Sequence, residues 1–167
     1  SAGSLHTCAI SGGRVYCWGY NAHGQTAGST TTTPVAGLSS VTTVSAGGYS
    51  TCAVSGGRVY CWGFNQWNTC GNGRHYEDDL DVTTPITGLT GVSDVVTGVA
   101  STTCALANGQ LYCWGYNDSG ETGVPGAYDY NCQLCYFEDD VITPIAGLSS
   151  VLMVVPGSDN TCYIKQY

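Results

Sequence analysis

The strongest constraint on this chain is a short segment that recurs along it. Residues 6–21 read HTCAISGGRVYCWGYN, residues 50–65 read STCAVSGGRVYCWGFN, and residues 102–117 read TTCALANGQLYCWGYN. A fourth copy begins within residues 160–167, which read NTCYIKQY. Recurrence at intervals of about 50 residues is typical of propellers and solenoids, in which each repeat stacks on the next.

Each copy has the pattern of a β-hairpin with a two-residue turn. The dipeptides Gly12-Gly13, Gly56-Gly57 and Asn108-Gly109 tolerate positive φ and favour turns of type I′ or II′. A turn centred on the first dipeptide places Cys8 opposite Cys17 in a non-hydrogen-bonded pair, where side chains approach closely. The same register in every copy predicts three cross-strand disulfides: Cys8–Cys17, Cys52–Cys61 and Cys104–Cys113.

The cysteine content indicates an oxidising compartment. The chain holds 10 Cys and 3 His in 167 residues, which favours disulfides over a zinc protein. We therefore expect an extracellular, secreted protein. The alternative is that the six hairpin cysteines are reduced and pack as small hydrophobic side chains.

The motifs HTCAI, GGRVYCWGYN and GQT resemble the regulator of chromosome condensation repeat. The resemblance is good over residues 1–65 and 83–117, moderate over 141–162 and poor elsewhere. It implies a β-propeller in which each repeat contributes four antiparallel strands. The chromatin-bound member of that family is a guanine-nucleotide exchange factor. This acidic, cysteine-rich and shorter chain is more similar to secreted members, so we expect no exchange activity.

The predicted fold is all-β, with about three antiparallel four-stranded propeller blades and a partial one. A single domain, residues 1–167, would contain repeats at about 1–44, 45–96, 97–154 and 155–167, with long inserts at 66–82 and 118–140. Three blades are too few to close a ring, so an open arc is expected within one chain. No apolar run of about 18 residues is present, and no membrane insertion is expected.

Charge is divided unevenly between the two parts of the chain. Residues 1–76 carry three Arg and no acid, whereas residues 77–167 carry all 12 acids and one Lys, for a net charge of −8. This surface disfavours nucleic acid as a partner. A basic front and an acidic back favour head-to-tail contact between copies.

The last strand is a candidate assembly site. By the repeat register, its hairpin partner strand would lie beyond Tyr167. We expect another copy to complete this half-blade, in a closed ring or a head-to-tail filament; the alternative is that the chain is a piece of a longer propeller. The candidate assembly residues are Asn160, Cys162, Ile164 and Tyr167.

The two inserts are the expected location of any ligand site, because long propeller loops often carry binding residues. Clustered carboxylates there could bind Ca²⁺: Glu77, Asp78, Asp79, Asp81, Glu138, Asp139 and Asp140. The alternative is a solvated acidic rim. Exposed aromatic residues could bind glycans or surface proteins, or could instead cover a small core of the insert: Trp67, Tyr76, Tyr128, Tyr130 and Tyr136.

Four cysteines remain outside the hairpin pairs. Cys132 and Cys135 could pair locally, which leaves Cys70 and Cys162 to pair with each other or across chains. A zinc site of Cys70, His75, Cys132 and Cys135 is the alternative. No catalytic set or phosphate-binding loop is present, so we expect a protein that is not an enzyme.

Overall fold

The chain is all-β in the computed structural model, which describes every residue except 75–77, 79–80, 124–141, 158–159 and 166–167. No helix occurs in the described part. The strands are β1 (His6–Ser11), β2 (Arg14–Gly19), β3 (Val41–Ala46), β4 (Ser50–Ser55), β5 (Arg58–Gly63), β6 (Val92–Thr97), β7 (Thr102–Ala107), β8 (Gln110–Gly115), β9 (Pro144–Ser149), β10 (Val151–Pro156) and β11 (Thr161–Lys165).

The predicted hairpins form in the predicted register. Cys8 lies opposite Cys17 in β1–β2, and Cys52 opposite Cys61 in β4–β5. Both residues of the first turn, Gly12 and Gly13, have positive φ, 57° and 72°, as a type I′ turn requires. All three expected cross-strand disulfides are present: Cys8–Cys17, Cys52–Cys61 and Cys104–Cys113.

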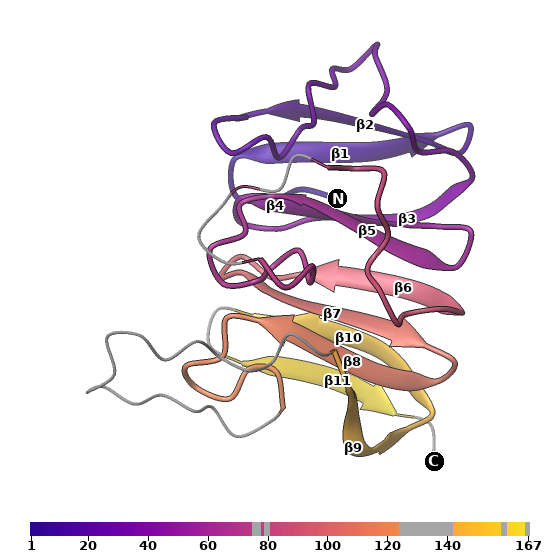
Figure 1. Cartoon of the computed structure of the whole chain (residues 1–167), viewed down its shortest axis with the longest axis vertical. Helices are drawn as coiled ribbons and strands as arrows, with labels where there is room; N and C mark the ends of the chain where they lie inside the picture. Colours follow the sequence, from indigo (N-terminus) through magenta and orange to yellow (C-terminus); the bar gives the residue numbers. More distant parts are fainter. Residues whose placement is uncertain (75–77, 79–80, 124–141, 158–159, 166–167) are drawn as a thin grey trace.

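The sheets stack as layers along the long axis of the molecule, without closing into a ring (Figure 1). The first blade contains β1–β2, the second β3-β4-β5, the third β6-β7-β8-β9, and the fourth β10–β11. Sequence and structure divide the repeats differently. The sheets begin at Val41, Val92 and Val151, a few residues before the boundaries drawn from the sequence repeats, because each of these strands pairs with the hairpin that follows it.

Among the described residues, only the third blade has a fourth strand paired in a ladder, between β8 and β9. In the first two blades the corresponding segment makes one backbone hydrogen bond to the hairpin, from Val35 N to Val15 O at 2.8 Å and from Ile86 N to Val59 O at 2.8 Å. The outer edge of these blades is therefore a segment joined to the hairpin by this backbone hydrogen bond, rather than a fully paired strand.

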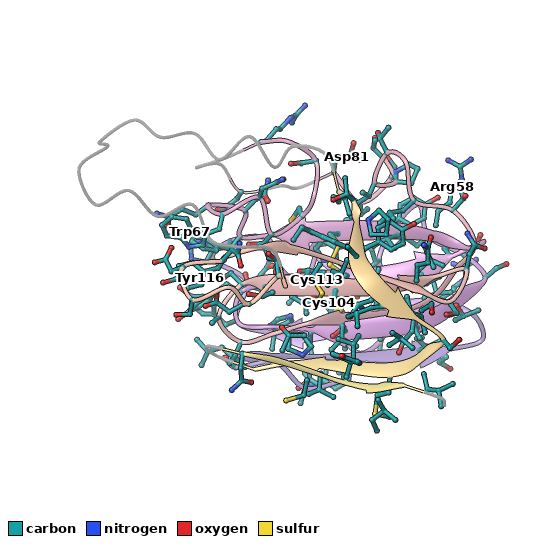
Figure 2. All side chains as sticks on the ribbon, turned by 90° about the horizontal axis from the view of Figure 1, so that it is seen from below. Arg58, Trp67, Asp81, Cys104, Cys113 and Tyr116 are labelled. Carbon is teal, nitrogen blue, oxygen red and sulfur yellow. A yellow bond between two sulfur atoms is a disulfide. The ribbon has the colours of Figure 1, made fainter. Side chains whose placement is uncertain are left out.

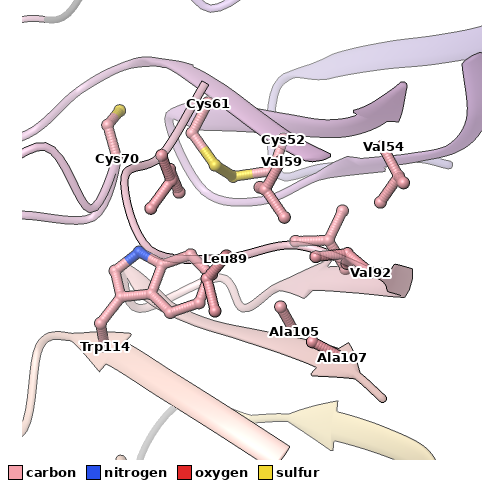
Figure 3. Packing of buried hydrophobic residues seen from close by; sticks show 12 residues of the cluster. Cys52, Val54, Val59, Cys61, Cys70, Leu89, Val92, Ala105, Ala107 and Trp114 are labelled. Atoms are coloured by element: carbon pink, nitrogen blue, oxygen red, sulfur yellow. A yellow bond between two sulfur atoms is a disulfide. The ribbon is translucent and has the colours of Figure 1, made fainter. Parts of the chain in front are cut away.

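Hydrophobic side chains fill the layers between blades. Figure 3 shows the cluster between the second and third blades, where the Cys52–Cys61 disulfide and Val54 face Val92 and Trp114. Separate clusters join the first blade to the second and the third to the fourth. Because each blade buries at least one face against a neighbour, blades stabilise one another rather than folding around a single core.

One main-chain carbonyl at each junction accepts hydrogen bonds from the next blade. We call it the junction carbonyl. At the first junction, Gln25 O accepts from Thr51 Oγ1 at 2.8 Å and from Trp62 Nε1 at 2.9 Å. At the second, the carbonyl of Thr69 accepts from Thr103 Oγ1 at 3.1 Å and from Trp114 Nε1 at 2.9 Å.

The third junction has the threonine bond alone. Glu121 O accepts from Thr161 Oγ1 at 2.7 Å. In each repeat an asparagine side chain holds the loop that presents the junction carbonyl, since its Oδ1 accepts a backbone N–H five residues later. These asparagines are Asn21, Asn65 and Asn117.

His6 extends the first junction. Its Nε2 lies 2.8 Å from Thr51 Oγ1, and the Thr51 hydroxyl already donates its proton to Gln25 O. Nε2–H of His6 is therefore the donor to Thr51, which leaves Nδ1 without a proton. Nδ1 is buried with no partner, and burial lowers the pKa of His6.

The junction hydrogen bond of Trp62 can be tested against a matched tryptophan. Trp62→Phe removes the donor to Gln25 O and should lower the free energy of unfolding by about 1–3 kcal/mol. Trp18, at the same position of the first blade, is 37 % exposed, so Trp18→Phe should change it by less than about 0.5 kcal/mol. Denaturant unfolding of both variants measures the difference, and equal losses would contradict this role of the junction carbonyl.

The burial of His6 predicts loss of stability in mild acid. The unfolded chain binds a proton at a pKa of about 6.5, whereas the folded chain resists protonation until lower pH. The contribution of His6 is therefore complete above about pH 6.5 and declines as the pH falls, by at most about 1.4 kcal/mol per pH unit for one proton. His6→Ser, which carries the residue found at Ser50, should unfold with a shallower pH dependence between pH 7 and 5. Identical slopes would exclude His6 as the cause.

Candidate functional site

The fourth blade exposes an apolar face. Met153 lies opposite Ile164, and Val155 opposite Cys162, on the side turned away from the third blade. Met153, Val155 and Ile164 are 52 %, 54 % and 56 % exposed, and Cys162 is also exposed and has no disulfide partner among the described residues. We call these four residues the trailing face.

The same positions are covered in the other blades. In the second blade, Cys52 and Val54 correspond to Cys162 and Ile164, and they are only 0 % and 1 % exposed because the third blade packs on them. Ser45, which corresponds to Val155, accepts a hydrogen bond from Thr97 N at 3.0 Å across that junction. The same positions of the repeat are therefore buried where another blade covers them, and they are exposed in the fourth blade.

The first blade exposes the opposite kind of face. Trp18 is 37 % exposed, whereas Trp62, at the same position of the second blade, is fully buried against the first. Ala9 is likewise exposed, although the corresponding Ala53 is fully buried. Ala9, Trp18 and the half-buried Tyr16 form the leading face, which has the composition of a surface that receives a preceding blade.

Aromatic rings gather at the rim between the first two blades. The ring of His23 lies 5.1 Å from Phe64, 5.4 Å from Tyr49 and 6.4 Å from Tyr20, all edge-on. Its Nδ1 is 3.2 Å from both carboxylate oxygens of Asp78. These five residues, which we call the aromatic cluster, come from two blades and one insert. The sequence singled out only Asp78, as a candidate calcium ligand.

Two residues of the predicted insert sites are placed in protein contacts. Trp67 packs edge-on against Tyr116, 5.5 Å away on the next blade, and Figure 2 shows the two side by side. Asp81 accepts hydrogen bonds from Thr84 Oγ1 at 2.6 Å and from both Oγ1 and N of Thr83. These bonds, led by that from Thr84, lower the pKa of Asp81 to about 2.

The structure does not bring the described carboxylates together. Asp78 contacts His23, and Asp81 contacts its own turn. No group of three or more His, Cys, Asp or Glu residues suited to a metal occurs among the residues that the structure describes. A cleft of about 180 Å³ lies beside Cys70, lined among others by Arg74 and Asp81.

Several predicted site residues lie outside the described residues. Of the candidate calcium ligands these are Glu77, Asp79, Glu138, Asp139 and Asp140. Of the other candidates they are Tyr76, Tyr128, Tyr130, Tyr136, Cys132, Cys135, His75 and Tyr167. Cys70 is buried in the core between the second and third blades, whereas Cys162 is exposed on the fourth, and the two do not form a disulfide with each other. Asn160 is exposed beside Cys162, and its main-chain oxygen accepts a hydrogen bond from Gly157 N at 2.7 Å.

The stacked antiparallel sheets, three of them built on a disulfide-bonded hairpin, define a repeat protein of the β-propeller type. Models of the regulator of chromosome condensation (RCC1) repeat match residues 1–25 and 56–105. The chain therefore contains RCC1-type repeats within these residues. No curated protein sequence matches it. In the described residues, no helix has the length and apolar character to cross a membrane.

Solved structures carry the same fold. Prp20p from Saccharomyces cerevisiae is 22 % identical with a TM-score of 0.72 over 98 % of this chain and 42 % of its own. The same yeast protein bound to Kap60 gives a TM-score of 0.73 at 22 % identity, over 98 % of this chain and 40 % of its own. Human WBSCR16 is 26 % identical with a TM-score of 0.53, over 70 % of this chain and 32 % of its own. The chain therefore spans about two fifths of the yeast relative.

Proposed function

We propose that this protein acts by association rather than by catalysis, outside the cell, with its end blades stacked against blades of a second copy. The trailing face carries the proposal. Its exposed Met153, Val155 and Ile164 correspond to positions that are buried at the junction between the second and third blades. Burial of such side chains stabilises each contact by about 25 cal/mol per Å² of apolar surface removed from water.

Three further observations support this proposal. The leading face exposes Trp18, and Trp62, at the same position of the second blade, donates a hydrogen bond to the junction carbonyl of Gln25. The weakly basic front and acidic back of the chain favour head-to-tail contact. Since one chain spans 42 % of Prp20p, two chains together have most of the length of that relative. Such stacking produces a closed ring if the rotation closes and a filament if it does not.

A relative of the same fold binds other proteins, which supports protein binding as the general role. Yeast Prp20p binds Gsp1p and histones, and a crystal structure contains it bound to Kap60. At 22 % identity the likeness supports a shared fold alone, so binding of Gsp1p, histones or Kap60 is not part of the proposal for this chain. The three disulfides support an oxidising compartment and hence secretion. An alternative, a lectin-like or protein-binding module, would use the two inserts, most of whose candidate residues lie outside the described ones.

The trailing face can be tested with residues borrowed from the other blades. Met153→Asp combined with Val155→Ser copies Asp94 and Ser45, and should weaken self-association at least about tenfold, because it removes apolar surface and adds a charge. Leu152→Ser copies Ser93 at a position that stays exposed even in covered blades, so it should have no effect beyond about twofold. Sedimentation of unreduced protein across a concentration series measures both.

The association proposal fails on either of two results. A protein that sediments as a single chain at every concentration has no such contact. Association that the double variant leaves unchanged uses another surface. Cys162→Ser in the same series asks whether that exposed thiol adds a covalent link, which would appear as a species lost on reduction.

A further inference from the structure

One ring of the aromatic cluster, that of Tyr49, is not required by the local backbone. The position of Tyr49 is held by Ser101 in the third repeat, yet the local backbone is the same there. Phe64 N donates to Tyr49 O at 3.0 Å, and Tyr116 N donates to Ser101 O at 3.2 Å. The local backbone therefore forms with a small side chain at this position, and the tyrosine ring is available for another role.

The cluster is also accessible to a ligand. Tyr20 and Tyr49 are 44 % and 39 % exposed, and their rings lie 6.3 Å apart in an edge-on arrangement. Their hydroxyl groups make no hydrogen bond to the described residues. The ring of Phe64 packs edge-on against Tyr49, 6.1 Å away, and against His23. The loop of His23 is joined to the second blade by the hydrogen bond from Trp62 Nε1 to Gln25 O.

His23 supplies a directed polar group. Both oxygens of Asp78 accept from Nδ1, which places the proton on that nitrogen. In the neutral imidazole Nε2 is then the acceptor, and it has no partner among the described residues. An imidazole held by a carboxylate in this way presents one nitrogen, in one orientation, to a hydroxyl group of a ligand.

These features favour one chemical class. A ligand that suits them has apolar C–H faces to lie on the tyrosine rings and hydroxyl groups to donate to His23 Nε2 and to meet the tyrosine hydroxyls. The cluster has no Lys or Arg side chain and contains Asp78, in a chain of net charge −8, so an anionic ligand is disfavoured. We propose that the aromatic cluster binds a neutral pyranose unit of a saccharide.

The tyrosine rings are exposed at the surface, so each sugar unit should bind weakly. The probes are three neutral hexasaccharides of different linkage: cellohexaose, laminarihexaose and chitohexaose. We expect at least one to bind with a dissociation constant of about 1 mM or below, measured by calorimetry and by shifts of the His23 ring signals in NMR spectra. No binding by any of the three would overturn the proposal.

Variants copied from the repeat keep the fold while they remove the site. Tyr49→Ser and His23→Ser carry the residues found at Ser101 and Ser119, and each should weaken binding about tenfold while the protein stays folded at the assay temperature. Asp78→Asn keeps the shape but accepts from Nδ1 less strongly, and should weaken binding about threefold. Tyr163→Ser, on the fourth blade, removes a tyrosine that is 46 % exposed and should leave binding within about twofold.

Other outcomes decide against a sugar site. Binding that survives both serine variants would place the saccharide elsewhere. Tighter binding of tetramethylammonium than of the saccharides, lost in Asp78→Asn, would make the cluster a cation site. The site is independent of the proposed association: the variant with Met153→Asp and Val155→Ser should keep full saccharide binding, and Tyr49→Ser should keep full association.

Discussion

A main-chain carbonyl oxygen at each blade junction fixes how one blade sits on the next. Gln25 O and Thr69 O each accept two hydrogen bonds from the next blade, one from a threonine and one from a tryptophan. The two donors reach one oxygen because they lie directly opposite each other in the hairpin, as Thr51 and Trp62 do. The disulfide hairpin thus fixes the donors, and the asparagine-held loop fixes the acceptor.

Both candidate surfaces follow from this junction. The loop that presents Gln25 O also carries His23, so the bond that joins two blades also positions the imidazole against Tyr49 and Phe64 of the second blade. At the ends of the stack the same rule leaves one half of a junction uncovered. Among the described residues, no blade covers Trp18, and none covers the trailing face of β10–β11.

Features built from residues close together in the sequence can be predicted from it, whereas features that join distant residues cannot. The hairpin register and the three disulfides depend on turns of two residues and on alternation along a strand, so they can be read from local sequence. The aromatic cluster joins positions as far apart as Tyr20 and Asp78, and no local pattern marks it. Asp78 and Asp81 stand close together in sequence as carboxylates, but His23 and Thr84 engage them separately.

The sequence alone therefore determined the unit: an all-β hairpin closed by a disulfide, repeated with a threonine and a tryptophan in constant register. Those properties rest on backbone geometry and side-chain alternation, which act within a few residues. Only the tertiary structure decided which faces of the unit are covered and which rings meet at the rim. Burial and ring contacts depend on how one blade sits on the next, and the stacking is set by hydrogen bonds between residues 26 to 45 positions apart.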